Sequence, residues 1–298
     1  MSTTTNTTKH SIMAHMISHY PDRETSRAVA RALVDAGVSY LEVQFPFSDP
    51  SADGPAIQQA STVAIEAGFR VDDGFALLSE ITAETTVPVY LMTYASLVVS
   101  RGVEQFCRAA ADAGVCGLIV PDLPFDYDEG LYAAGSAAGL DVVPVLVAGV
   151  GEERLQRVIE HASGSVYVAL RAGITGSETV LDDDSLAFLD RVRSAGVRVF
   201  GGFGVRRREQ VEALAPHLDA VVVGSQFIRT LTDALAGAPT AAAAGACSDS
   251  GSAGAWAATA LERSAGGHPN GGGAAADGSS RSAAAAVGEA ARELVAGG

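Results

Sequence analysis

The chain has 298 residues, of which 48% are hydrophobic, so it carries enough apolar material for a large core. Its net charge of −15 and its pI of about 4.7 leave no basic surface for nucleic acid or an anionic membrane. Lys9 is the sole lysine and lies in a polar N-terminal arm. A Schiff-base enzyme needs a buried lysine, so pyridoxal phosphate on this chain and a lysine-dependent aldolase mechanism are excluded.

From Ser11 onward, short apolar runs alternate with runs that have helical composition and periodicity. Nearly continuous apolar strands are typical of parallel strands covered on both faces. The predicted strands are Ile12–Ile17, Tyr40–Gln44, Val87–Met92, Gly117–Val120, Val142–Val147, Val166–Leu170, Val197–Gly201 and Ala220–Val223. The clearest predicted helices are Glu24–Ala36, Val103–Ala113, Glu152–His161, Asp184–Ser194 and Arg208–Ala215. Several helices end at a glycine, namely Gly37, Gly114 and Gly196, which fits a C-cap.

Eight strand–helix units in residues 11–235 predict a closed (β/α)8 barrel, the TIM barrel fold. The main competitor is a doubly wound open sheet, which usually places a G-x-G-x-x-G motif after its first strand. Here the first strand runs into Ser18–Asp22, which contains no glycine. The alternation therefore favours the barrel.

The rest of the chain divides by composition. Residues 1–10 are predicted to form a flexible arm without a hydrophobic signal region. Residues 236–282 are rich in Ala, Gly and Ser and form a low-complexity insertion that we predict to be disordered, because it offers too little apolar surface for a core. Residues 283–298 regain helical character as a last barrel helix. With scattered cysteines and no run of membrane-spanning length, we expect a soluble, cytoplasmic protein.

Two carboxylates stand out at the second predicted strand and the loop after it. Glu42 lies inside the strand, where burying a charge is costly without a partner or a task. Asp53 lies in the Pro-, Asp- and Gly-rich loop 46–55, which the barrel fold places over the mouth. Carboxylates in different environments can divide acid and base roles. The alternatives are a salt bridge from Glu42 to an arginine, and a turn or helix cap near Pro55 made by Asp53.

Glycines follow the last two predicted strands, which run into Gly201–Gly204 and into Gly224–Phe227. Barrels of this class bind phosphate at these two loops, where glycine lets backbone N–H groups approach an anion and a helix N-terminus adds a favourable dipole. The loop Arg171–Ser177 after the sixth strand has glycines on both sides of Thr175, which indicates a mobile lid.

The segments Leu41-Glu42, Pro46-Phe47-Ser48-Asp49-Pro50 and Ala52-Asp53-Gly54-Pro55 together resemble the signature of the tryptophan synthase alpha subunit family. The resemblance extends over residues 12–229 and includes the lid and Pro121–Pro124. It implies Glu42 and Asp53 as the catalytic pair. It implies substrate contacts from Tyr167, Phe203 and Thr175, with Ile57, Met92 and Ile119 as an apolar wall. It implies phosphate contacts from Gly176, Gly204, Gly224 and Ser225.

The implied activity is a lyase reaction, the retro-aldol cleavage of indole-3-glycerol phosphate to indole and glyceraldehyde 3-phosphate. The resemblance also implies no cofactor on this chain and a pyridoxal-phosphate beta subunit as partner, in an alpha2-beta2 assembly. One departure concerns that partner: Ser96 stands where the family usually has a partner-facing asparagine. Two alternatives stay open, another phosphate-binding barrel lyase or isomerase and a non-catalytic regulatory partner. No metal is expected, because no three or four ligands converge, although His15 or His19 is expected to face the pocket.

Overall fold

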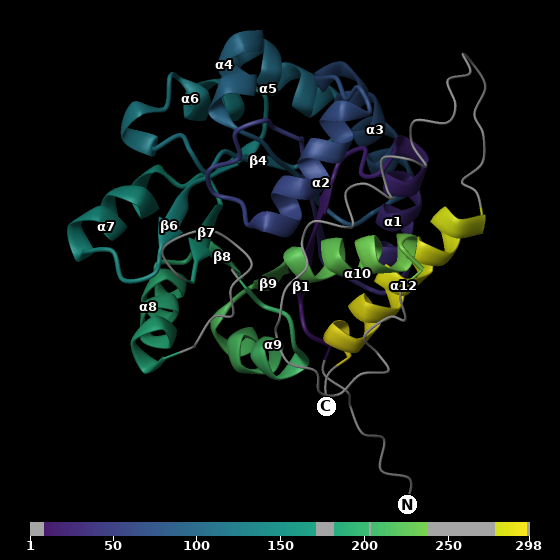
Figure 1. The fold of residues 1–298 in the computed structure, drawn as a ribbon. Helices are drawn as coiled ribbons and strands as arrows, with labels where there is room; N and C mark the ends of the chain where they lie inside the picture. The colour runs from purple at the N-terminus through teal and green to yellow at the C-terminus, as the bar shows by residue number, and fades with distance from the viewer. Residues whose placement is uncertain (1–8, 171–181, 203, 238–277, 297–298) are drawn as a thin grey trace, which may run out of the picture.

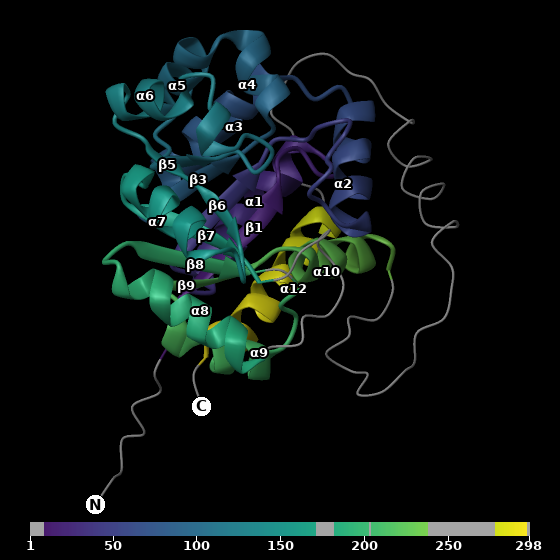
Figure 2. The ribbon, with the colours of Figure 1, turned by 90° about the vertical axis from the view of Figure 1, so that its left-hand side faces the viewer.

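A computed structural model describes residues 9–170, 182–202, 204–237 and 278–296. In these residues parallel strands form the inner wall of a barrel and helices surround it (Figures 1 and 2). The strands are β1 (Ile12–Ile17), β2 (Tyr40–Gln44), β3 (Val89–Met92), β4 (Gly117–Ile119), β5 (Asp141–Val143), β6 (Val145–Val147), β7 (Ser165–Ala169), β8 (Arg198–Gly202) and β9 (Ala220–Val223). They pair in the order β5-β4-β3-β2-β1-β9-β8-β7-β6, and every pair is parallel. The predicted (β/α)8 fold is confirmed.

The fifth predicted strand needs the largest correction, while the others differ from the observed bounds by at most two residues at either end. Val142–Val147 was predicted as a single strand, but the structure divides it into β5 and β6 at Pro144. Proline has no N–H and cannot donate to a strand ladder. β5 therefore pairs only with β4, and β6 pairs only with β7. β5 and β6 are therefore the two ends of the strand order, and the chain connects them directly through Pro144.

The helices cover the outer face of the strands (Figure 1). They are α1 (Arg23–Asp35), α2 (Pro55–Glu66), α3 (Val71–Glu84), α4 (Ala95–Arg101), α5 (Val103–Asp112), α6 (Leu131–Ala137), α7 (Glu152–His161), α8 (Asp183–Ser194), α9 (Arg208–Leu214), α10 (Ser225–Leu235) and α12 (Gly278–Val295), with 3-10 turns η1 (Phe125–Tyr127) and η2 (Ala215–His217). Asp22 caps α1 by accepting from the Thr25 N–H at 2.8 Å. The predicted C-cap glycines Gly37, Gly114 and Gly196 all have positive φ, at 91°, 78° and 79°.

Alternation along the strands separates two layers of core. Side chains that point outward pack under the helices in one large cluster. Side chains that point inward fill the barrel in a second cluster, made of Met13, Tyr90, Met92, Ile119, Val143, Tyr167, Phe200, Ala220 and Val222. Along β2, Leu41 and Val43 belong to the outer cluster. Glu42 and Gln44 therefore point into the barrel, at the end where the strands finish.

Helix α12 packs against α1 and α10 and so joins the first and last units of the barrel (Figures 1 and 2). The two helices approach closely at Gly288, where an added Cβ would lie 3.0 Å from the Ala32 carbonyl oxygen. The helix begins at Gly278, whereas the sequence analysis placed its start at Ala283. Residues 238–277 of the predicted insertion lie outside the described residues. Among the helices that the structure describes, none has the length and apolarity to cross a bilayer.

Candidate active site

The site is built around β2, which carries two buried polar side chains into the barrel. Glu42 is 1% exposed and Gln44 is 0% exposed. Both face the interior because strand alternation sends every second side chain inward. The ionic partner of Glu42 is His15, not an arginine as the alternative interpretation proposed. Glu42 is therefore not a surface ion pair at the strand end but part of a buried polar cluster.

Asp53 is held by two donors at the mouth of the barrel. Gln44 Nε2 donates to Asp53 Oδ2 at 2.6 Å, and the Tyr94 hydroxyl donates to the same oxygen at 3.0 Å. The Tyr94 ring also stacks on Phe47, with centroids 5.0 Å apart. Tyr94 therefore contacts the loop 46–55 both at Phe47 and at Asp53. Burial raises the pKa of Asp53, while the Gln44 and Tyr94 hydrogen bonds and the His15 charge oppose that rise. The cap residue of α2 is Gly54, and the Asp53 side chain points to Gln44 and Tyr94 instead.

His15 completes the polar cluster, and its role was not assigned from the sequence. Its Nδ1 lies 3.1 Å from Glu42 Oε2, and the side chain is buried. The parallel register of β1 and β2 pairs His15 with Glu42 directly, so both side chains leave the same face of the sheet. His19, the other candidate, has a positive φ of 62° and packs edge-on against Phe69. The pairing of two strands is the signal that would have found His15.

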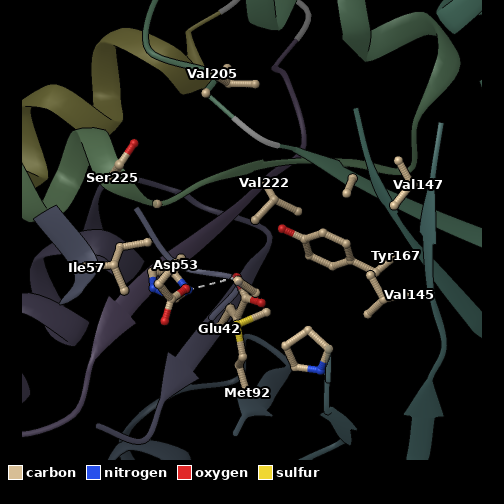
Figure 3. A pocket seen from close by; sticks show the side chains of 16 residues that line it. Glu42, Asp53, Ile57, Met92, Val145, Val147, Tyr167, Val205, Val222 and Ser225 are labelled. Carbon is tan, nitrogen blue, oxygen red and sulfur yellow. Dashed lines mark hydrogen bonds and ion pairs between the residues drawn. The ribbon is translucent and has the colours of Figure 1, made fainter. Parts of the chain in front are cut away.

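These groups open onto a cavity of about 180 Å³ (Figure 3). Its lining comprises His15, Glu42, Ala52, Asp53, Ile57, Met92, Pro121, Val145, Val147, Tyr167, Ala169, Gly204, Val205, Val222, Gly224 and Ser225. Figure 3 shows the Tyr167 ring reaching into this space opposite Asp53 and Ile57. Apart from the polar cluster, most of the lining side chains are apolar, so the cavity suits a flat apolar ring with one polar edge.

Most of the predicted site residues meet at this cavity, with one exception among those described. Ile119 is fully buried in the inner core cluster and does not line the cavity, because β4 ends there and the wall above it is formed by Pro121. Glu42, Asp53, Ile57, Met92, Tyr167, Gly204, Gly224 and Ser225 do line it. Thr175, Gly176 and Phe203 lie outside the described residues. His15, expected from the sequence as one of two histidines that could face the pocket, also lines it. Gln44, Tyr94 and the wall residues Val145, Val147 and Val222 were not predicted.

The far end of the cavity has the features of an anion site. Gly224 is the N-cap of α10, and Ser225 is the first residue of that helix. Gly204 has a positive φ of 76°, a conformation that favours glycine. Free N–H groups and the dipole at a helix N-terminus attract negative charge. The cavity is therefore lined on one side by two carboxylates, from β2 and the loop after it, and on another by the helix N-terminus that follows β9.

A profile of the tryptophan synthase alpha chain family matches residues 1–254. A tryptophan synthase alpha chain from Syntrophotalea carbinolica is 38% identical over 223 residues, covering 74% of this chain and 88% of the relative. One from Halalkalibacterium halodurans is 40% identical over 211 residues, covering 70% of this chain and 79% of the relative. This chain belongs to the tryptophan synthase alpha chain family. Members are lyases that cleave indole-3-glycerol phosphate, and the alpha chain carries no pyridoxal phosphate.

Solved structures agree with this family. A chain of Mycobacterium tuberculosis tryptophan synthase superposes with a TM-score of 0.70 at 34% identity, covering 76% of this chain and 86% of that chain. A chain of a tryptophan synthase complex from Pyrococcus furiosus superposes with a TM-score of 0.68 at 27% identity, covering 76% of this chain and 92% of that chain. The alternative hypothesis, another phosphate-binding barrel lyase or isomerase, is therefore rejected.

Proposed function

We propose that Glu42 and Asp53 carry the cleavage of indole-3-glycerol phosphate to indole and glyceraldehyde 3-phosphate on this chain. The observation that supports it best is their placement: one carboxylate on β2 and one on the loop after it face the same apolar cavity. At the other end of that cavity stands the N-terminus of α10. This arrangement matches a substrate that has an apolar ring at one end and a phosphate at the other.

The proposed chemistry has two proton transfers, and Glu42 takes part in both. The Glu42 carboxyl donates a proton to the ring carbon that bears the glycerol chain, which turns the ring into a leaving group. The Asp53 carboxylate stabilises the positive charge that develops at the ring nitrogen. The Glu42 carboxylate then takes the proton of the neighbouring chain hydroxyl. As that O–H bond breaks, the aldehyde forms, the carbon–carbon bond cleaves, and its electrons return to the ring to give indole.

The phosphate is proposed to bind the N-terminus of α10 through the backbone of Gly224 and Ser225, with Gly204 from the preceding loop. Anchoring this remote group contributes binding energy that fixes the reacting carbon near Glu42. Gly176 is assigned to the same phosphate by the family resemblance, and Thr175 and Phe203 to the substrate. The roles of these three residues rest on the family resemblance alone, and variants at these positions would test them.

The central test is Glu42→Gln, which keeps the size of the side chain and removes its titrating group. We expect kcat for indole release to fall by about 10²–10⁴-fold, with substrate binding changed little. Glu66→Gln, on the exposed end of α2, is the matched control and should retain wild-type turnover. A Glu42→Gln protein that releases indole at near wild-type rate would remove Glu42 from the mechanism.

We also propose a beta-subunit partner at the mouth of the barrel, in an alpha2-beta2 assembly. A member of a tryptophan synthase complex is among the matched structures. On this chain two large apolar side chains are exposed in the elements that follow β3 and β4: Val99 on α4 at 48% and Tyr127 in η1 at 77%. The Ala95 N–H at the start of α4 donates to Asp122 Oδ1 in the loop after β4 at 2.9 Å. This hydrogen bond holds α4 and the loop after β4 next to each other.

Tyr127→Asp should weaken binding of the cognate beta subunit, because a desolvated charge replaces an apolar contact. We expect a drop in affinity of at least tenfold in sedimentation or calorimetry, with the turnover of the isolated chain unchanged. Ala195→Asp, at the exposed C-terminal end of α8, is the control. Equal affinity of the Tyr127→Asp protein and the wild type would place the partner elsewhere.

A further inference from the structure

The contact between His15 and Glu42 lies within the proposed acid–base machinery. His15 Nδ1 is 3.1 Å from Glu42 Oε2, and both side chains are almost completely buried. The second polar atom of each group, His15 Nε2 and Glu42 Oε1, is also buried and has no hydrogen-bond partner in the structure. A buried carboxylate with one oxygen anchored and one oxygen unsatisfied is prepared to bond something that enters the cavity.

The imidazole is wedged between the two functional ends of the cavity. A Cβ added to Gly224, at the start of α10, would lie 3.2 Å from His15 Cβ, Cγ and Cδ2. The ring therefore rests against the backbone of the proposed phosphate cradle and reaches across to Glu42. This packing leaves the ring little freedom to turn, so its Nδ1 stays aimed at β2.

The other groups around His15 leave Glu42 as its only close charged partner among the described residues. Asp53 and Tyr167 line the same cavity, and the charge of Asp53 raises the pKa of His15. The helices packed behind it, α1 and α10, contribute apolar side chains to the same space. They are Val29, Phe227, Ile228 and Leu231, with the Tyr20 ring and the β1 residues Met16 and Ile17 beside them.

We propose that His15 is a positioning residue for Glu42: it anchors one carboxylate oxygen, aims the other at the substrate, and shares with Glu42 the proton that the pair gives to the ring carbon. This inference rests on the proposed function, because it assigns how Glu42 is held during that reaction. In the reactive form of the pair Glu42 carries the proton on Oε1, the oxygen without a partner, while the Nδ1–H of neutral His15 donates to Oε2. Oε1 gives its proton to the ring carbon, and the proton that Oε1 then takes from the chain hydroxyl restores the pair.

The state of the pair depends on pH in a defined direction. Burial lowers the pKa of His15, but the hydrogen bond and charge of Glu42 and the charge of Asp53 outweigh it, so that the net pKa is raised above 6.5. The pair therefore keeps its proton to a higher pH than a free imidazole would. Cleavage should decline as pH rises through the pKa of His15, because the pair then lacks its proton, and should decline again in acid as the second carboxylate is protonated.

The kinetic test compares His15→Phe, which fills the space without a donor, with His15→Asn, whose amide reaches the Nδ1 position. We expect His15→Phe to lower kcat roughly 10–100-fold with little change in KM, the effect of one charge-assisted hydrogen bond. His15→Asn should recover part of kcat and lose the alkaline decline. His217→Asn is the matched control, since His217 forms a 2.7 Å pair with Asp190 on the surface. Wild-type kcat and pH profile in His15→Phe would overturn the proposal.

A second measurement does not depend on activity. NMR titration of the His15 ring, assigned by its loss in His15→Asn, should give a pKa above 6.5 in the wild type. In Glu42→Gln it should fall below 6.5, because burial then acts without the partner charge. The same titration in both proteins would show that the pair is not coupled, and overturns the proposal. If the wild type releases no indole, the proposed function fails, whereas the coupling of the pair is still decided here.

Discussion

At the scale of single residues, the proposed mechanism depends on how Asp53 is kept charged in an apolar setting. Its Oδ2 accepts from Gln44 and from Tyr94, and neither donor is itself charged. Burial nevertheless raises the pKa of Asp53 above its usual value of 3.8. In the proposed mechanism Asp53 stabilises a developing cation and has to be ionised, so we expect these two hydrogen bonds to set the pH below which activity is lost.

Tyr94→Phe tests this directly, because it keeps the ring that stacks on Phe47 and removes the hydroxyl. The Tyr94 hydrogen bond lowers the pKa of Asp53, so its loss should raise that pKa further. Activity that needs ionised Asp53 is lost as pH falls through its folded pKa. The acid limb of the kcat/KM profile should therefore move to higher pH, with Tyr127→Phe as the control. An unmoved acid limb would assign that limb to another group.

The same residues show what the sequence predicts and what it does not. Glu42 and Asp53 were predictable because a charged residue inside an apolar strand and a shaped loop after it are both local signals. His15 and Tyr94 were not, since their roles come from contacts across the barrel: His15 through the register of β1 with β2, Tyr94 through the folding back of the loop onto Asp53. The register between strands depends on how far they tilt when the sheet closes into a barrel, and a short segment of sequence does not specify that tilt.

At the scale of elements, strands were easier to predict than the ways in which they join. Apolar runs predicted β1, β2 and β9 with their observed bounds, because strands covered on both faces are mostly apolar. The segment Val142–Val147 was predicted as one strand because the residues on both sides of Pro144 are apolar. It is divided into β5 and β6 because Pro144 has no N–H to donate to a neighbouring strand.

The docking of α12 makes a prediction about stability. Gly288→Leu should separate α12 from α1, because an added Cβ already meets the Ala32 carbonyl oxygen at 3.0 Å. Overpacking costs about 1–3 kcal/mol, which for a chain of this size lowers Tm by roughly 2–10 °C. Gly278→Leu in the same helix, where nothing lies within 4 Å, is the control. Equal melting of the two variants in calorimetry would mean that α12 docks loosely.

At the scale of the whole molecule, the charge is strongly one-sided, with 35 acidic against 20 basic residues. Like charges repel in the compact state, and salt screens them over a Debye length that shrinks from about 10 Å at 0.1 M to about 3 Å at 1 M. We expect Tm at neutral pH to rise as sodium chloride is raised from millimolar to molar. Near the pI of about 4.7 the same titration should leave Tm flat or lower it, since only attractive pairs are then screened. A salt-independent Tm at neutral pH would show that surface ion pairs balance the repulsion.

The position of α12 has a consequence for how this chain tolerates change. The helix binds the outer faces of α1 and α10 as a ligand would, and the His10 N–H bonds the Val295 carbonyl at 3.0 Å where the two ends meet. A tethered ligand is held by its local concentration, and the entropy of closing a tether grows only with the logarithm of its length, about 0.6 kcal/mol for each doubling. We therefore expect the free energy of folding to depend only weakly on how many residues separate α10 from α12 in the chain.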